Sequence, residues 1–170
     1  MIRAEFVVVS PSCADGGDVD DPPRVGIWLG AYVYLPKFKR GKPVSFIMDT
    51  GAESSVLDIS DAKLLIPRRS LFKGYRMAAP REAEGIGGTA WYYPEKAYIV
   101  LEHEDGSQDL IEQTIDIPVA SNDNWNATLG SLLGMDLLSR YLVTIDFSRP
   151  LVSLEYPGDG DQPASPLAAQ

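Results

Sequence analysis

The amino-acid sequence predicts an all-β domain, mostly antiparallel, with one short helix near its C-terminal end. Apolar residues recur mainly at every second position, which is the period of a half-buried strand. Glycine (15 residues) and proline (13 residues) are spread through the 170-residue chain and supply turns. Only Met135–Leu142 has the spacing of an amphipathic helix. A chain of this length holds one domain comfortably and two with difficulty.

The first half of the chain contains three predicted strands. Residues Ile2–Val9 include a short apolar stretch, and Val25–Leu35 carries apolar side chains at every odd position. A basic turn, Lys37–Lys42, ends that strand, and the short apolar strand Val44–Met48 follows. We expect residues 58–81 to be irregular, because their prolines and glycine break any long helix.

Hairpins are predicted in the second half of the chain. Three glycines in Gly85–Gly88 supply the positive φ angles of a tight hairpin tip. The strands Lys96–Glu102 and Leu110–Ala120 flank the turn dipeptide Asp105-Gly106. Near the C-terminus, alternating apolar residues on either side of Ser148-Arg149-Pro150 indicate a terminal hairpin or a bent strand pair.

Three regions follow from these patterns. We expect residues 1–24 to be an N-terminal strand with an acidic linker, 25–156 to form the main domain, and 157–170 to be a flexible tail. The linker and the tail are rich in Pro, Gly and Asp and show no apolar period.

Composition excludes several classes of function. With 24 acidic and 15 basic residues the net charge is −9. We expect the chain to bind neither nucleic acid nor an anionic membrane, because both would repel it. The chain has no apolar run of about 18 residues and no secretory signal, so we expect a cytoplasmic protein. Its single cysteine and single histidine leave too few ligands for a zinc site, and no cofactor is expected. His103 stands beside an Asp-Gly turn without a nucleophile elbow and is predicted to be a solvated loop residue.

One aspartate stands where a charge is unusual. Asp49-Thr50-Gly51-Ala52 comes directly after the apolar strand and precedes Ser55-Val56-Leu57. A carboxylate delivered by a buried strand into a glycine turn is partly desolvated, and the backbone around it can approach a ligand closely.

These residues resemble the active-site signature of the aspartic peptidases, and two further motifs resemble the retroviral-type branch, the retropepsins. Glu84–Gly88 falls where those enzymes have a glycine-rich flap, and Leu132-Leu133-Gly134 leads into a short helix as theirs does. The resemblance covers residues 25–156 and is nearer to cellular and prokaryotic retropepsin-like domains than to viral ones. Met135 stands where viral enzymes often have Arg, so Glu53 must find another partner or stay solvated.

The resemblance implies an aspartic endopeptidase that acts on a peptide or protein substrate. Peptide hydrolysis of this kind needs two carboxylates that share one proton, and the sequence has Asp-Thr-Gly once, so the resemblance implies a homodimer with Asp49 on its two-fold axis. Thr50 and Gly51 would support the site. The residues implied to contact substrate are Ala52 and Glu53 in the loop, and Gly85, Ile86, Gly87 and Gly88 in the flap.

Two other interpretations stay open. The chain could be a catalytically silent retropepsin-like dimer that binds peptide or acts as a scaffold, because a fold does not imply a function. It could also be a monomeric β-barrel in which the Asp-Thr-Gly motif is accidental.

Overall fold

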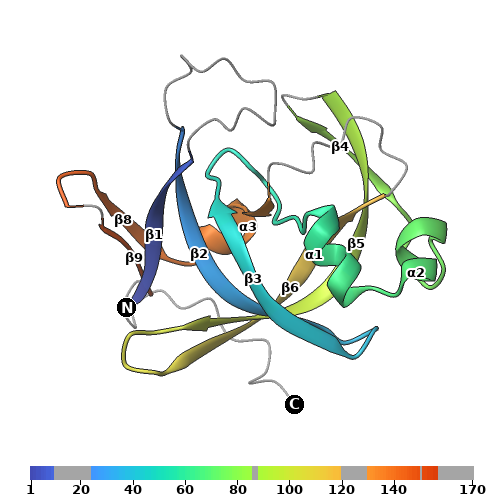
Figure 1. The fold of residues 1–170 in the computed structure, drawn as a ribbon, viewed down its shortest axis with the longest axis horizontal. Coiled ribbons are helices and arrows are strands. Elements are labelled where there is room, and N and C mark those ends of the chain that lie inside the picture. Colours follow the sequence, from blue (N-terminus) through green and yellow to red (C-terminus); the bar gives the residue numbers. More distant parts are fainter. Residues whose placement is uncertain (10–23, 86–87, 120–129, 150, 157–170) are drawn as a thin grey trace.

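A mostly antiparallel β-sheet forms the framework of the chain, which confirms the predicted fold class (Figure 1). The structure is a computed structural model that describes residues 1–9, 24–85, 88–119, 130–149 and 151–156. Most of the acidic linker, Ile86 and Gly87 of the hairpin tip, and the tail 157–170 therefore lie outside the described residues. The strands are β1 (Ile2–Val9), β2 (Arg24–Leu35), β3 (Arg40–Met48), β4 (Arg81–Gly85), β5 (Gly88–Glu102), β6 (Gln108–Pro118), β7 (Ser131–Leu133), β8 (Leu142–Asp146) and β9 (Leu151–Glu155).

β2 is the strand around which the sheet is arranged. Its first residues pair with β1, its last residues pair with β5, and β3 runs along most of its length. The hydrogen-bonded path continues as β4-β5-β2-β1-β9-β8, with β6 beside β5. β3 also pairs with β7, and among the strand pairs of the described residues this one alone is parallel.

The side chains of β2 alternate between buried and exposed, as predicted. Leu29, Val33 and Leu35 are at most 1% exposed, whereas Tyr32 between them is 45% exposed. The buried face packs on side chains from β3, β5 and β6 to form the core. Members of that core with no exposed surface include Phe46, Leu57, Ile99, Leu101, Ile115, Ile117 and Leu133.

The described residues form three short helices, where the sequence predicted one. α1 (Ile59–Leu65) and α2 (Arg68–Lys73) occupy the segment expected to be irregular, and α3 (Met135–Leu138) is shorter than predicted. Pro67 and Gly74 do break a long helix, but here they delimit two short ones. Pro67 is the N-cap of α2 and favours extended backbone at the residue before it, while Gly74 ends α2 with φ of 64°.

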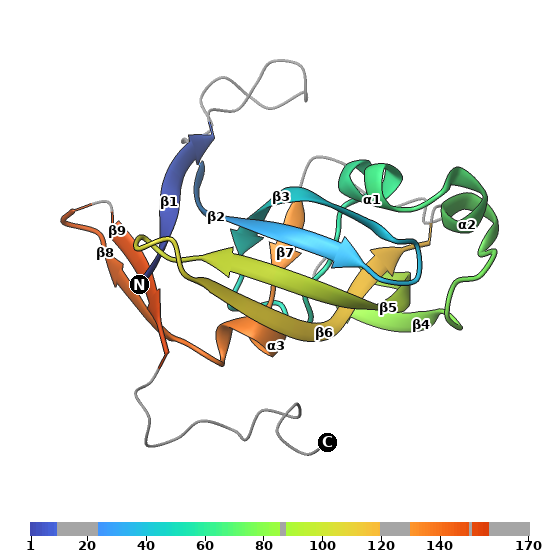
Figure 2. The ribbon, with the colours of Figure 1, turned by 90° about the horizontal axis from the view of Figure 1, so that it is seen from below.

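The terminal strands lie at one side of the molecule, and α1 and α2 lie at the other (Figures 1 and 2). β8 and β9 form an antiparallel hairpin, which decides between the two predictions for this segment. β1 pairs with both β2 and β9, so the N-terminal strand belongs to the same sheet as the strands that follow it. None of the helices in the described ranges is both long enough and apolar enough to cross a membrane.

Candidate active site

Asp49 lies directly after β3, at the point where that strand leaves the core. Phe46, three residues earlier, has no exposed surface, and Asp49 itself is half-buried. The backbone N–H of Asp49 donates to the carbonyl of Leu133 on β7 at 3.0 Å, which extends the parallel pairing of the two strands by one residue. The aspartate is thus presented by two paired strands at once.

The glycine turn orients the carboxylate. The N–H of Gly51 donates to Oδ1 of Asp49 at 2.8 Å, and the N–H of Ala52 donates to the Asp49 carbonyl at 3.2 Å. Thr50 and Gly51 are exposed, so this turn is open to a ligand or to another chain. Because a Cβ on Gly51 would lie 3.2 Å from Oδ1, a side chain there would crowd the same oxygen.

The loop that carries Asp49 begins and ends on the same short strand. After the turn the chain returns to β7, where Val56 exchanges two backbone hydrogen bonds with Leu132, at 2.9 and 2.8 Å. β7 therefore lies between β3 and the Val56 segment. Fixing both ends of the loop to one strand limits the positions that Asp49 can adopt.

α3 holds the loop from its other side. The N–H of Met135 donates to the carbonyl of Ala52 at 2.8 Å, and that of Asp136 donates to the carbonyl of Glu53 at 3.2 Å. The approach is so close that a Cβ on Gly134 would lie 2.6 Å from the carbonyl carbon of Ser54. The Leu-Leu-Gly motif thus allows α3 to reach the loop backbone.

A buried hydrogen-bond network joins Ser55 to Asp136. The hydroxyl of Ser55, which has no exposed surface, donates to Oδ1 of Asp136 at 2.6 Å and accepts from the N–H of Gly134 at 3.0 Å. The N–H of Ser55 donates to the other carboxylate oxygen at 3.0 Å. This network satisfies the buried polar groups where the loop meets α3.

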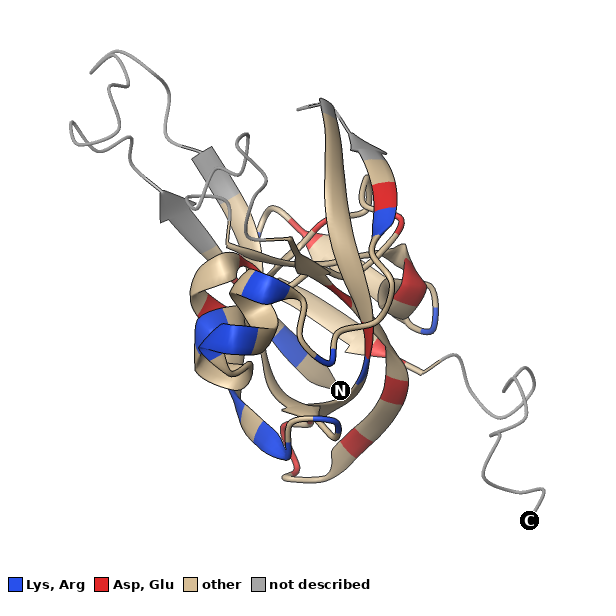
Figure 3. Ribbon diagram, turned by 90° about the vertical axis from the view of Figure 1, so that its right-hand side faces the viewer, with Lys and Arg blue, Asp and Glu red and all other residues tan. Residues whose placement is uncertain are grey.

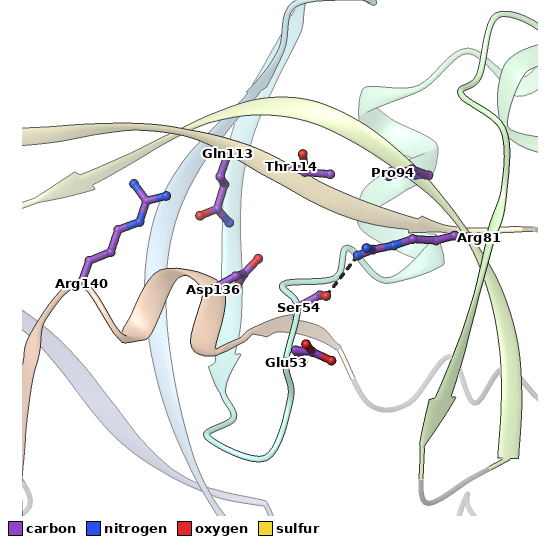
Figure 4. A pocket seen from close by; sticks show the side chains of 8 residues that line it. All are labelled: Glu53, Ser54, Arg81, Pro94, Gln113, Thr114, Asp136 and Arg140. Atoms are coloured by element: carbon purple, nitrogen blue, oxygen red, sulfur yellow. Dashed lines mark hydrogen bonds between the residues drawn. The ribbon is translucent and has the colours of Figure 1, made fainter. Parts of the chain in front are cut away.

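Arg81 connects the base of the β4–β5 hairpin to the same loop. Its Nη2 donates to Oγ of Ser54 at 3.1 Å, as Figure 4 shows, and its guanidinium also binds the buried Asp116 on β6. The hydrogen bond to Asp116 raises the pKa of Arg81 above its ordinary value, and burial opposes that rise. The loop and the hairpin thus share one charged anchor.

Glu53 stays exposed, which was one of the two outcomes considered for it. Its side chain borders an open cavity of about 570 Å³ (Figure 4). Its negative charge is among the influences that raise the pKa of Arg81. The cavity is lined by Glu53, Ser54, Arg81, Pro94, Gln113, Thr114, Asp136 and Arg140.

The glycine-rich hairpin is present as predicted, with Gly85 paired opposite Gly88 at its end. Ile86 and Gly87, which connect them, lie outside the described residues. In Figure 1 the hairpin end and the loop after β3 extend toward the same side of the molecule. Residues Asp49 to Glu53 lie together because they are adjacent in the sequence. Arg81 links the hairpin to this loop through its hydrogen bond to Ser54.

His103 does not match its prediction as a solvated loop residue. Its side chain is 15% exposed, and Nε2 lies 2.9 Å from Oδ2 of Asp109. That same oxygen accepts a hydrogen bond from the buried Tyr141 hydroxyl at 3.0 Å. The chain beyond the Asp-Gly turn folds back as β6, which brings Asp109 against the histidine.

The sequence reasoning missed the ionic partners of the loop. Asp116 stands between Ile115 and Ile117 at the buried end of β6, and this acidic residue between two apolar ones was the available signal, because a buried charge needs a partner. Nothing in the sequence indicated that Arg81, 35 positions away, is that partner. In the described part of the chain, no cluster of three His, Cys, Asp or Glu side chains could hold a metal ion.

Comparison with known proteins finds similarity in structure and none in sequence families. No family model and no curated protein sequence matches the chain. A solved structure that does match is the crystal structure of a retropepsin-like aspartic protease from Rickettsia conorii, which is 20% identical. The match covers 92% of this chain and 94% of that one, with a TM-score of 0.49. Since this score lies below 0.5, the proposed function rests on the geometry around Asp49.

Proposed function

We propose that the chain is an aspartic endopeptidase that works as a homodimer, with Asp49 of each copy contributing one carboxylate. The observation that carries the proposal is the presentation of Asp49. One carboxylate oxygen is fixed by the Gly51 N–H at 2.8 Å, and the other has no hydrogen-bond partner among the described residues. A half-buried carboxylate that is oriented in this way is suited to proton transfer.

A second copy supplies what one chain lacks. Two aspartates at the separation of roughly 3 Å known from aspartic proteases cannot both ionise, so they share one proton. The ionised carboxylate accepts a proton from a water molecule as that water attacks the peptide carbonyl carbon. The protonated carboxylate donates a hydrogen bond to the carbonyl oxygen, where negative charge develops. Proton transfer to the leaving amine then releases the two peptide products.

The neighbouring residues have supporting roles in this proposal. Thr50, which is exposed beside Asp49, hydrogen-bonds across the two-fold axis and holds the two loops together. Gly51 lets the substrate backbone approach, and Ala52 and Glu53 line the cleft. The β4–β5 hairpin, with Gly85, Ile86, Gly87 and Gly88 at its end, closes over the bound peptide and excludes water.

The β8–β9 hairpin is our candidate for the dimer contact. β8 pairs only with β9 among the described strands, so its other edge is free to pair. Leu142 at its start is 59% exposed and Phe147 just after it is 81% exposed, which gives that edge an apolar margin. Because each copy carries a net charge of −9, we expect assembly to be more favourable at higher salt.

The test is cleavage of a peptide panel by the wild-type chain and by Asp49→Asn. We expect the substitution to abolish cleavage and to leave folding intact, and we expect Asp105→Asn, in an exposed turn, to have no effect. Activity per chain should fall on dilution as dimers dissociate, and the pH profile should be bell-shaped and centred on the acidic side. Cleavage retained by Asp49→Asn would disprove the mechanism.

A second measurement separates a peptidase from a silent peptide-binding module. A statine peptide, which mimics the tetrahedral transition state, should raise the Tm of the wild-type chain by binding the paired carboxylates. We expect that increase to be lost in Asp49→Asn. If an ordinary peptide raises the Tm of both chains equally and neither chain cleaves it, the chain is a peptide-binding module.

A further inference from the structure

The two helices after the candidate active-site loop, and the turn that follows α2, carry a group of basic and apolar side chains that the proposed function does not use. Residues 62–80 hold five of the chain's 15 basic residues and none of its 24 acidic ones. Figure 3 shows blue segments gathered on these helices. The helical basic patch is defined by the exposed cations Lys63, Arg68, Arg69, Lys73 and Arg76 and by the exposed apolar side chains Leu64, Phe72 and Tyr75.

No carboxylate in the described part of the chain neutralises the cations of this patch. Among the described residues, no carboxylate lies within ion-pair distance of any of the five. Lys42, next to α1, by contrast pairs with Asp61 at 3.0 Å. In a chain with net charge −9, a surface with five cations that pair with no described carboxylate has a local positive potential that attracts an anionic partner.

Two of the arginines lie over exposed aromatic rings. The guanidinium carbon of Arg69 lies 4.4 Å from the centre of the Tyr75 ring, and that of Arg68 lies 5.7 Å from the Phe72 ring. The cation–π attraction restricts the arginine side chains, and the N–H groups of a guanidinium that lies over a ring can still bind carboxylates. The donors are thus partly ordered before any partner arrives.

Apolar surface lies among these cations. Leu64 is 62% exposed, and the rings of Phe72 and Tyr75 are 48% and 50% exposed. A hollow of about 370 Å³ lies beside them, lined by Lys63, Ile66, Arg68, Leu71 and Phe72. Ile66 and Leu71 are each 1% exposed, so the hollow has apolar residues beneath and cations at its rim. Such a site fits an apolar side chain that is flanked by negative charges.

Arg76 adds a conformational observation. Its φ is 62°, in the left-handed region that glycine or asparagine adopts more easily than arginine. A positive charge therefore stands in the patch at a position where a smaller residue would relieve strain.

We propose that the helical basic patch binds an acidic peptide segment of a partner protein, which inserts one apolar side chain into the hollow between α1 and α2. A peptide fits better than an anionic membrane or nucleic acid because it is narrow. Acidic charges of this chain that lie farther from a bound peptide than the Debye length, about 8 Å at physiological salt, are largely screened. An extended anionic surface would also meet the repelling acidic faces.

The test measures binding separately from catalysis. The probe is a short fluorescein-labelled peptide of Glu and Asp residues around one Phe, titrated with the full-length chain carrying Asp49→Asn and followed by fluorescence anisotropy. We expect binding that weakens as salt is added. A matched peptide of Gln and Asn around the same Phe should bind much more weakly, and a Glu and Asp peptide with Ala in place of Phe should lose part of the affinity.

Variants then locate the site. Replacing two exposed charges by Arg68→Gln and Arg69→Gln together should weaken the acidic peptide about three- to tenfold. Lys96→Gln is the control, because Lys96 is an exposed cation outside the patch that lies over the Tyr98 ring and pairs with Glu112 at 2.6 Å; this variant should bind as the parent does. Arg76→Gly should weaken binding without lowering the Tm, since it removes the charge and relieves the strained backbone.

Three results would overturn the proposal. The first is equal binding of the acidic and the neutral peptides. The second is a double variant that binds the acidic peptide as tightly as Lys96→Gln does. The third concerns vesicles of phosphatidylcholine and phosphatidylserine. If these vesicles displace the peptide, bind the chain more tightly than the peptide does, and fail to bind the Arg68→Gln and Arg69→Gln double variant, the patch is a membrane contact. None of these outcomes depends on whether Asp49 is catalytic.

Discussion

Arg81 binds both carboxylate oxygens of Asp116, with Nε donating to Oδ1 at 3.1 Å and Nη2 donating to Oδ2 at 2.6 Å. Asp116 is 3% exposed, and its backbone is hydrogen-bonded on both sides: its N–H donates to the carbonyl of Ser55, and its carbonyl accepts from the N–H of Leu57, each at 2.9 Å. The ion pair therefore joins the first residue of β4 to the segment that follows the Asp49 loop. Movement of the hairpin base and placement of the loop are coupled through this pair.

Replacing Arg81 by alanine should destabilise the fold and loosen the hairpin. The substitution leaves the buried Asp116 without its cation. We expect a loss of about 2 kcal/mol in the free energy of unfolding, less than for a fully buried pair because the Arg81 side chain is 49% exposed. Urea unfolding measures the loss, and hydrogen exchange of the β4 and β5 amides reports the hairpin.

The control for this prediction is Arg149→Ala. Arg149 pairs with Asp146 at 2.8 Å, but its side chain is 80% exposed, so the change should cost no more than about 0.5 kcal/mol. Arg81→Lys keeps the charge without the two-point geometry and should fall between wild type and Arg81→Ala. Equal stability of Arg81→Ala and Arg149→Ala would show that the Asp116 pair does not anchor the hairpin.

Replacing Ser55 by alanine should lower the free energy of unfolding by more than the loss of a single hydrogen bond would. The Ser55 hydroxyl donates to the half-buried Asp136 and accepts from the buried Gly134 N–H, so its removal leaves that N–H without a partner and takes one of two hydrogen bonds from the carboxylate. We expect a loss of about 2 kcal/mol. Ser107→Ala is a matched control, since the Ser107 hydroxyl also donates to a carboxylate at 2.6 Å but lies exposed in a turn, and it should cost less than about 0.5 kcal/mol. Similar losses for the two variants would contradict the buried network.

The positions of many strands along the chain could be predicted, because strands have a strong local signal. A window of about ten residues is enough to detect each of three features: the alternation in β2, the glycines of the hairpin, and the apolar strand that leads to Asp49. Helices α1 and α2 were missed because Pro67 and Gly74 were interpreted as breaking helical structure, whereas they delimit it.

The contacts that fix the candidate site could not be predicted in the same way. Arg81 and Asp116 are 35 residues apart, and Ser55 and Asp136 are 81 apart. Their contact depends on the packing of β6 and α3 against the loop, and no local pattern encodes a pairing over such a separation. The acidic residue between two apolar ones at the buried end of β6 indicates that a partner exists and leaves its identity open.

Replacing Gly134 by alanine should disturb the Asp49 loop directly. The added Cβ would meet the backbone of two loop residues, lying 2.7 Å from the carbonyl oxygen of Ser54 and 2.9 Å from that of Ala52. Backbone atoms cannot rotate away as a side chain does, so we expect a loss of at least about 2 kcal/mol. Gly30→Ala in β2 is the control, because a Cβ there meets nothing within 4 Å. Equal stability of the two variants, measured by urea unfolding, would contradict the close packing of α3 on the loop.

Tyr141 should make the fold sensitive to alkaline pH. Burial, aided by interaction with Tyr156, raises the pKa of Tyr141 well above its ordinary value of 10. Above that pH the unfolded chain loses this proton while the folded chain keeps it, so stability should fall as the pH rises past about 10. Tyr141→Phe, compared with the exposed control Tyr32→Phe, should show a shallower decline in urea-unfolding free energy between neutral and alkaline pH. An unchanged slope in Tyr141→Phe would assign the alkaline sensitivity to another group, such as Tyr92, whose pKa burial also raises.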